Sequence, residues 1–130
     1  MTRSTQGGRL PGAILVVDDD AAVCRLLVRM LERMGCRVTT AASGEDALEM
    51  IRVETADFQV LLSDVSMPDM TGVELARLVK RENPSMEILL MSGDTEDSIE
   101  APSINFHVAG FVDKPFTQKS LLQALRLCFG

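Results

Sequence analysis

The sequence contains no Trp or Tyr, a single His, and no long hydrophobic run. Without Trp or Tyr it lacks the usual platform on which nucleic-acid bases stack. A net charge of −6, with no basic cluster, also argues against direct nucleic-acid binding. The longest apolar run, Ala13–Val17, is far too short to span a membrane, and the N-terminus lacks the apolar stretch of a signal peptide. We therefore expect a cytoplasmic protein that neither binds nucleic acid directly nor inserts into a membrane.

Cysteine is also scarce. The three cysteines, Cys24, Cys36 and Cys128, are too few and too scattered for a disulfide framework or a zinc site. Free cysteine behaves as a small hydrophobic residue and is usually buried. We expect Cys24 and Cys128 to be core residues of a reduced protein.

What the chain does have is enough apolar sequence for one domain. It is 130 residues long and 46% hydrophobic, which favours a packed core over disorder. Residues 1–12 are polar and Gly-rich, as in a flexible lead or linker. We expect residues 13–130 to form the folded domain.

Within that domain, short apolar runs alternate five times with helical stretches. The runs are Ala13–Val17, Cys36–Ala41, Phe58–Ser63, Met86–Met91 and Ala109–Val112. Strand–helix alternation with short connections predicts right-handed crossovers and a parallel sheet. The first, third and fourth runs are almost wholly apolar, as in strands covered on both faces, whereas the second alternates and the fifth is short, as at sheet edges. The prediction is a single α/β domain, a doubly wound (βα)5 parallel sheet of strand order 2-1-3-4-5.

Local signals mark several helix ends. Asp20 can cap the first helix, and Gly35 sits where that helix should end in a left-handed residue. Thr71 and Glu74 have the spacing of a capping box at the start of the third helix. In the fourth helix, expected to begin near Thr95, Pro102 should break or shorten the helix.

Reactive side chains follow the strands that meet at one edge of this sheet. Asp18, Asp19 and Asp20 follow the first strand, Asp64 ends the third, Ser92 the fourth and Lys114 the fifth. In the predicted order these four strands are neighbours, so acids, a hydroxyl and an ammonium group converge. Each feature alone has an ordinary explanation as a cap, a turn or a surface hydroxyl, but their joint placement predicts a site.

Clustered carboxylates repel one another, and a divalent cation with oxygen ligands removes the conflict. We expect Mg²⁺ (or Mn²⁺) here, with Asp64 attacking phosphorus to form an acyl phosphate. Lys114 would then pair with the phosphoryl oxygens, the Ser92 hydroxyl would donate to one of them, and the Gly93 backbone N–H would add a donor.

Four segments together resemble the receiver domains of two-component response regulators. They are Ile14–Asp20, Leu62–Gly72, Leu90–Gly93 and Lys114–Phe116. The resemblance covers about residues 13–129 and implies a flavodoxin-like fold. It also implies a phosphoprotein that accepts its phosphoryl group from a histidine kinase or a histidine phosphotransfer domain, and that catalyses only its own phosphorylation and dephosphorylation.

The resemblance assigns roles to individual residues. Asp64 looks like the phosphoacceptor and Asp19 like a direct Mg²⁺ ligand, with Asp18 assisting through water and Ser66 contributing its backbone carbonyl. Ser92 and Phe111 occupy the positions of the hydroxyl and the aromatic residue that couple phosphorylation to a distant surface. The Lys114–Pro115 bond is commonly cis in this family.

Other features leave the output open. Ser66 and Asp94 stand at positions that, in this family, tune the attack of water on the phosphoryl group. Pro102 falls in the fourth helix, which together with strand 5 and helix 5 forms the usual output face, through which a homodimer could form. His107 is expected to be a surface residue. The chain is interpreted either as a stand-alone or output-linked regulator or as a receiver from a hybrid histidine kinase.

Two other functions fit parts of the pattern. Asp18 and Asp20 have the spacing of a haloacid-dehalogenase-like phosphatase, although Ala22 and the short chain depart from that family. A flavin-binding module shares the fold, but the acids after the first strand would repel the flavin phosphate. Steady turnover of phosphate esters would favour the first alternative, and a coloured protein the second.

Overall fold

A computed structural model describes residues 12–53, 57–93 and 108–129 of the chain. Five strands and four helices lie in these ranges. They are β1 (Ala13–Val17), α1 (Ala21–Arg33), β2 (Arg37–Ala41), α2 (Gly44–Ile51), β3 (Val60–Asp64), α3 (Gly72–Glu82), β4 (Glu87–Ser92), β5 (Gly110–Asp113) and α6 (Gln118–Phe129). No helix in the described part of the chain is long and apolar enough for a membrane span.

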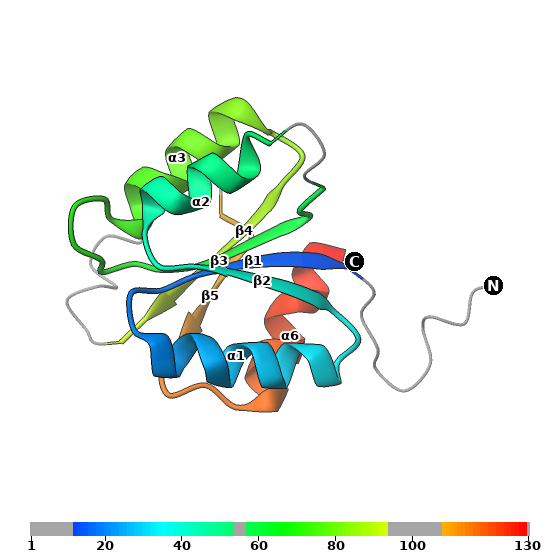
Figure 1. Cartoon of the computed structure of the whole chain (residues 1–130). Coiled ribbons are helices and arrows are strands. Elements are labelled where there is room, and N and C mark those ends of the chain that lie inside the picture. Colours follow the sequence, from blue (N-terminus) through cyan, green and yellow to red (C-terminus); the bar gives the residue numbers. More distant parts are fainter. Residues whose placement is uncertain (1–11, 54–56, 94–107, 130) are drawn as a thin grey trace.

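The strands form one parallel sheet in the order β2-β1-β3-β4-β5, which confirms the predicted order. Helices α1 and α6 cover one face of the sheet, and α2 and α3 cover the other (Figure 1). The two edge strands are those with the least continuous apolar sequence, whereas β1 and β3 are buried along their whole length. The fold is the flavodoxin-like α/β class.

The sheet divides the core into two clusters because successive side chains of a strand point to opposite faces. In β1, Leu15 and Val17 pack toward α2 and α3, while Ile14 and Val16 pack toward α1 and α6. Strands β3 and β4 alternate in the same way. Burial on both faces explains why these three central strands read as unbroken apolar runs.

The signals at the ends of α1 and at the start of α3 are confirmed. The Asp20 side chain accepts hydrogen bonds from the backbone N–H groups of Ala22 and Val23, and Gly35 has a φ of 98° just beyond the end of α1. Thr71 and Glu74 form both hydrogen bonds of the capping box at the start of α3. The sequence alone predicts these helix ends because the residues that interact there lie within a few positions of one another in the chain.

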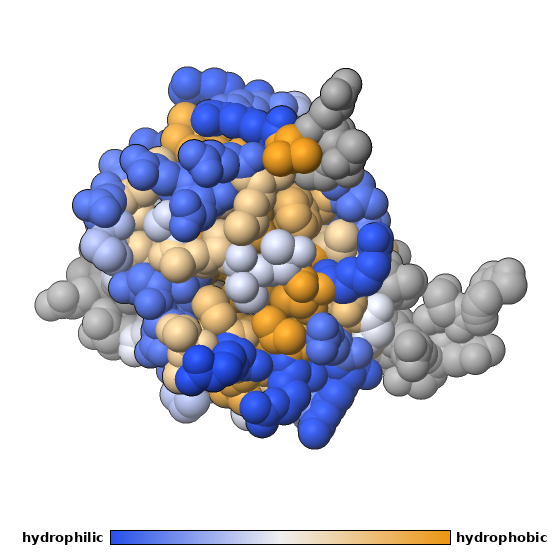
Figure 2. Space-filling view, viewed as in Figure 1, coloured by the Kyte–Doolittle hydropathy of each residue, from blue (hydrophilic) through white to orange (hydrophobic). Residues whose placement is uncertain are grey.

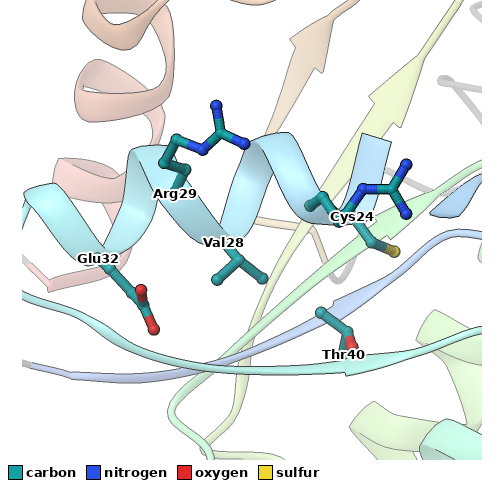
Figure 3. A pocket seen from close by; sticks show the side chains of 6 residues that line it. Cys24, Val28, Arg29, Glu32 and Thr40 are labelled. Carbon is teal, nitrogen blue, oxygen red and sulfur yellow. The ribbon is translucent and has the colours of Figure 1, made fainter. Parts of the chain in front are cut away.

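The expectation for two cysteines is met in part, because both are free and pack against the core. Cys24 and Cys128 are only partly buried, and Cys36 is the buried cysteine. Cys24 lines a groove between α1 and β2, and Figure 3 shows it and Val28 turned toward that strand while Arg29 points away. From the β2 side, polar side chains cover the helices and a less polar band runs between them (Figure 2). Cys24 lies at the margin of the apolar stripe of α1, where the edge strand cannot fully cover it.

Candidate functional site

The site lies at the carboxyl ends of β1, β3, β4 and β5. Asp18 directly follows β1, Asp64 is the last residue of β3, and Lys114 directly follows β5. Parallel strands bring their carboxyl ends to one edge of the sheet. The structure therefore assembles the acids and the ammonium group that the sequence places at strand ends.

The three consecutive aspartates have different surroundings. Asp18 is 1% exposed, and its Oδ1 accepts a hydrogen bond of 2.9 Å from the Asp20 backbone N–H. Asp19 is exposed. Asp20 caps α1 and is not part of the acidic cluster. The run of three acids thus supplies two carboxylates to the site and one to a helix.

Asp18, Asp19 and Asp64 each place a carboxylate oxygen within 4.8 Å of those of the other two. Three hard oxygen donors at this separation suit Mg²⁺, which prefers carboxylate and water ligands. The donor set fits the cation that the sequence analysis expects, and the side chains that would hold it come from two neighbouring strands.

Lys114 lies beside two of these acids. Its Nζ is 3.2 Å from Asp18 Oδ2 and 3.5 Å from Asp64 Oδ2, and its side chain is 23% exposed. Burial by itself lowers the pKa of this ammonium group, but attraction to Asp64 and Asp18 outweighs burial and raises the pKa above its ordinary value. Lys114 is therefore held in its charged form.

At Asp64, burial has a larger effect on the pKa than the neighbouring charges have. Burial raises the pKa of its carboxyl group and the nearby Asp18 charge adds to the rise, while Lys114 and the Ser66 backbone N–H oppose it. That N–H donates to Asp64 Oδ1 at 3.3 Å. The net result is a pKa above the usual value for an aspartate, because the effect of burial is larger than that of the nearby Lys114 charge.

Ser92 and Phe111 lie on the neighbouring strands β4 and β5 in different surroundings. Ser92 ends β4 and is 8% exposed, and its carbonyl oxygen accepts a 2.9 Å hydrogen bond from the Lys114 N–H. Phe111, on β5, is 40% exposed and lines a groove between β5 and α6 together with Leu127. The aromatic ring therefore faces outward, and the serine lies at the acidic site.

Of the remaining expectations from the sequence, some concern residues that the structure describes and others concern residues that it does not. The Lys114–Pro115 bond is cis, as the resemblance implies. Gly93 follows β4, and among the described residues a methyl group added there would meet only Lys114 Cδ, at 3.7 Å. Asp94, Pro102 and His107 lie outside the described residues.

One residue whose importance the sequence analysis missed is Gly72. A Cβ at this first position of α3 would lie 2.2 Å from the carbonyl oxygen of Asp64 and 3.0 Å from Val65 Cα. The helix can approach the backbone of the acidic residue only because this position is glycine. The available signal was a glycine directly after a capping threonine, where a stronger helix former is expected.

Comparison with known proteins decides the family. Residues 14–126 match the family model described as the response regulator receiver domain. The chain belongs to this family. The match favours a receiver domain over the phosphatase and flavin-binding alternatives.

Two relatives and one solved structure illustrate the range of receiver domains. The response regulator receiver protein CpdR of Brucella abortus is 33% identical over 86% of this chain and 92% of its own length. The sensor kinase CckA of the same organism is 34% identical over 87% of this chain but only 12% of its own length. The crystal structure of the response regulator protein TrrA from Thermotoga maritima, in complex with Mg²⁺–BeF, has a TM-score of 0.78 and 25% identity and covers 88% of this chain and 96% of its own. The chain thus spans nearly all of one curated relative and a small part of another.

Proposed function

We propose that this receiver domain accepts a phosphoryl group onto Asp64 from a histidine kinase or a histidine phosphotransfer domain, in a Mg²⁺-dependent reaction. The observation that carries the proposal is the grouping of Asp64 with Asp18 and Asp19, within 4.8 Å, beside the Lys114 ammonium group. A carboxylate that attacks a phosphoryl group needs positive charge close to both the attacking oxygen and the oxygens of the phosphoryl group. This site supplies one such charge and the ligands for another.

The cation would be held by Asp19 and Asp64, with the Ser66 backbone carbonyl as a further ligand and Asp18 acting through water. Bound Mg²⁺ (or Mn²⁺) neutralises charge on the phosphoryl oxygens during transfer. Asp18 has a second task, because its buried carboxylate fixes the Lys114 ammonium group at 3.2 Å. The Mg²⁺–BeF complex of TrrA supports this ligand chemistry for a similar chain.

In the transfer, an Asp64 carboxylate oxygen forms a bond to phosphorus while the phosphorus–nitrogen bond of the donor phosphohistidine breaks. The electron pair of the broken bond returns to the imidazole nitrogen, which takes up a proton from solvent. Lys114 pairs with one phosphoryl oxygen, the Ser92 hydroxyl donates to another, and the Gly93 N–H adds a donor. The elevated pKa of Asp64 shows that burial and nearby negative charge penalise its ionised form, so added cationic charge there has a large effect.

The proposed response is a shift between two conformations. Ser92 is buried at the site, whereas the Phe111 ring is 40% exposed on β5. Drawing the Ser92 hydroxyl toward a phosphoryl group frees space into which Phe111 can turn. A phosphoryl group at one end of the sheet thereby changes the groove between β5 and α6. A homodimer through this face is part of the proposal.

The relatives support two contexts for the domain. CpdR is a receiver protein of nearly this length, whereas CckA carries a similar segment within a longer sensor kinase. We propose that residues 13–130 are the receiver and residues 1–12 a lead or linker. The chain is then either a stand-alone or output-linked regulator or part of a hybrid kinase.

The first test is stoichiometric phosphorylation. With Mg²⁺ and acetyl phosphate, intact-protein mass spectrometry should find one added phosphoryl group, and omission of Mg²⁺ should abolish the addition. Asp64→Asn should remain unmodified, while the control Asp57→Asn, at an exposed aspartate paired with Arg37, should react as wild type does. Phosphorylation of the Asp64→Asn protein would refute the assignment of this residue.

A further inference from the structure

The loop between β3 and α3, residues 65–71, carries the backbone that directly follows the candidate phosphoacceptor. Val65 and Met67 are buried in the core beneath α2 and α3, while Ser66 between them is exposed. The Ser66 N–H donates to Asp64 Oδ1 at 3.3 Å, and the Gly72 N–H donates to the Val65 carbonyl oxygen at 2.9 Å. Any displacement of this loop therefore moves the hydrogen bond to the Asp64 carboxylate.

The middle of the loop is strained. Asp69 has a φ of 69°, a left-handed value that is costly for a residue with a side chain. The Met70 N–H closes a three-residue turn around it by donating to the Pro68 carbonyl oxygen at 2.7 Å. A turn of this kind persists only where surrounding contacts maintain it, and such strain is concentrated at functional sites.

One contact that maintains the turn comes from α2. A Cβ added to Gly44, the first residue of that helix, would lie 2.6 Å from Met70 Sδ and 3.1 Å from Met70 Cγ. The methionine side chain thus lies directly over the bare Cα of Gly44, and it also packs against the α2–α3 core. Ser43 caps α2 by accepting a hydrogen bond from the Asp46 N–H, which fixes the surface beneath the methionine.

We infer that Met70, resting on Gly44, is a positioning residue for this site: it maintains the strained turn at Asp69 and with it the place of the Ser66 backbone beside Asp64. The contact acts through the loop and touches none of the reacting groups. The inference deepens the proposed function and rests on it, because the value of a fixed Ser66 backbone lies in metal binding and phosphorylation at Asp64.

The test compares two methionines of the same core. Met70→Ala removes the contact, whereas Met50→Ala removes a side chain of similar burial on α2 that packs in the same cluster. In metal-free protein, NMR hydrogen exchange of the Ser66 and Gly72 amides should accelerate in Met70→Ala and not in Met50→Ala. The Kd for Mg²⁺, measured by titration calorimetry, should rise about tenfold in Met70→Ala alone, as for loss of an outer contact of a metal site.

A second variant approaches the contact from the other side. Alanine is a better helix former than glycine, so a merely structural role for Gly44 predicts that Gly44→Ala keeps the stability of the wild type and leaves Mg²⁺ binding unchanged. We expect weaker Mg²⁺ binding and faster Ser66 exchange, because the new methyl group displaces Met70. Combined with Met70→Ala, the second substitution should add little further loss.

The outcomes separate this inference from the proposed function. Wild-type exchange rates in both Met70→Ala and Gly44→Ala would overturn the positioning role, as would equal effects of Met50→Ala. Failure of wild-type protein to bind Mg²⁺ or to take a phosphoryl group would instead refute the proposed function. The metal-free exchange rates report on the loop in either case.

Discussion

Lys114 balances one negative charge at a site that has several. Its Nζ lies 3.2 Å from one carboxylate and 3.5 Å from another, and Asp64 still has a raised pKa because burial and the Asp18 charge outweigh this compensation. The folded, metal-free protein therefore carries an uncompensated cost at neutral pH. A cation that binds only the folded state should offset that cost.

The first consequence concerns Asp64→Asn. Because the pKa of Asp64 is higher in the folded protein than its ordinary value of 3.8, the folded state binds a proton more readily than the unfolded state. The contribution of this group to the free energy of unfolding therefore falls as pH rises from about 3.8 through the folded pKa. Removing the charge should stabilise metal-free protein at pH 7 by on the order of 1 kcal/mol, the usual size of a single-substitution effect.

Urea unfolding followed by circular dichroism measures this effect. The advantage of Asp64→Asn over wild type should shrink as pH is lowered to about 3, where both states of wild type are protonated. The control Asp57→Asn, at an exposed side chain, should show little change at either pH. A less stable Asp64→Asn protein at pH 7 would contradict the view that burial and nearby charge govern this carboxylate.

Residues at strand ends could be placed from sequence, whereas residues in tertiary contact could not. Asp64 and Lys114 were predictable because their partners follow from the strand order. Two contacts depend instead on how helices dock: the approach of Gly72 to the Asp64 carbonyl oxygen and the packing of Met70 against Gly44. No spacing in the chain encodes that docking.

At the scale of elements, helix starts were the best predicted features. Asp20 and the Thr71–Glu74 capping box act over at most three residues, so the chain alone specifies them. Strand ends were predicted to within about two residues. Cys24 and Cys128 pack against the core but are only partly buried, because helical periodicity predicts which face of a helix turns inward, not how completely the sheet covers the margins of that face.

The docking of α3 onto β3 gives the second prediction. In Gly72→Ala the added methyl group would meet the Asp64 carbonyl oxygen at 2.2 Å, and neither the Cβ nor the backbone carbonyl can rotate away. We expect a loss of about 3 kcal/mol in the free energy of unfolding, the upper range for overpacking, although alanine is the better helix former.

Gly93→Ala is the matched control for this substitution. Its methyl group would meet Lys114 Cδ at 3.7 Å, an ordinary contact distance. Urea unfolding should therefore show little change for Gly93→Ala and a large loss for Gly72→Ala. Equal stability of the two variants would show that α3 can move away from the site without penalty.

At the scale of the whole molecule, the sheet separates two cores and carries the site on one edge. Central strands β1, β3 and β4 contribute side chains to both cores, so their ends are held from both faces. Strand β5, at the edge, is held less completely, and two of its four residues are exposed. A conformational response is expected where the sheet is least constrained.

The third prediction follows from this difference. Phosphorylation with Mg²⁺ and acetyl phosphate should lower the exposure of Phe111 from its present 40%. Selective labelling of phenylalanine and NMR with a soluble paramagnetic probe can measure this change. Broadening of the Phe111 signal should decrease, while that of Phe58, at the opposite end of β3, should stay constant. Unchanged broadening of Phe111 in fully phosphorylated protein would exclude its role in the switch.

The division of work among the three aspartates after β1 has a consequence for tolerance to mutation. In a library randomised at positions 18, 19 and 20, selection for folding should retain Asn, Ser and Thr at position 20, because each can cap α1. Selection for phosphorylation should add a requirement for acids at positions 18 and 19 alone. Of three positions that all hold Asp, position 20 would then accept several residue types, whereas positions 18 and 19 would accept only acids.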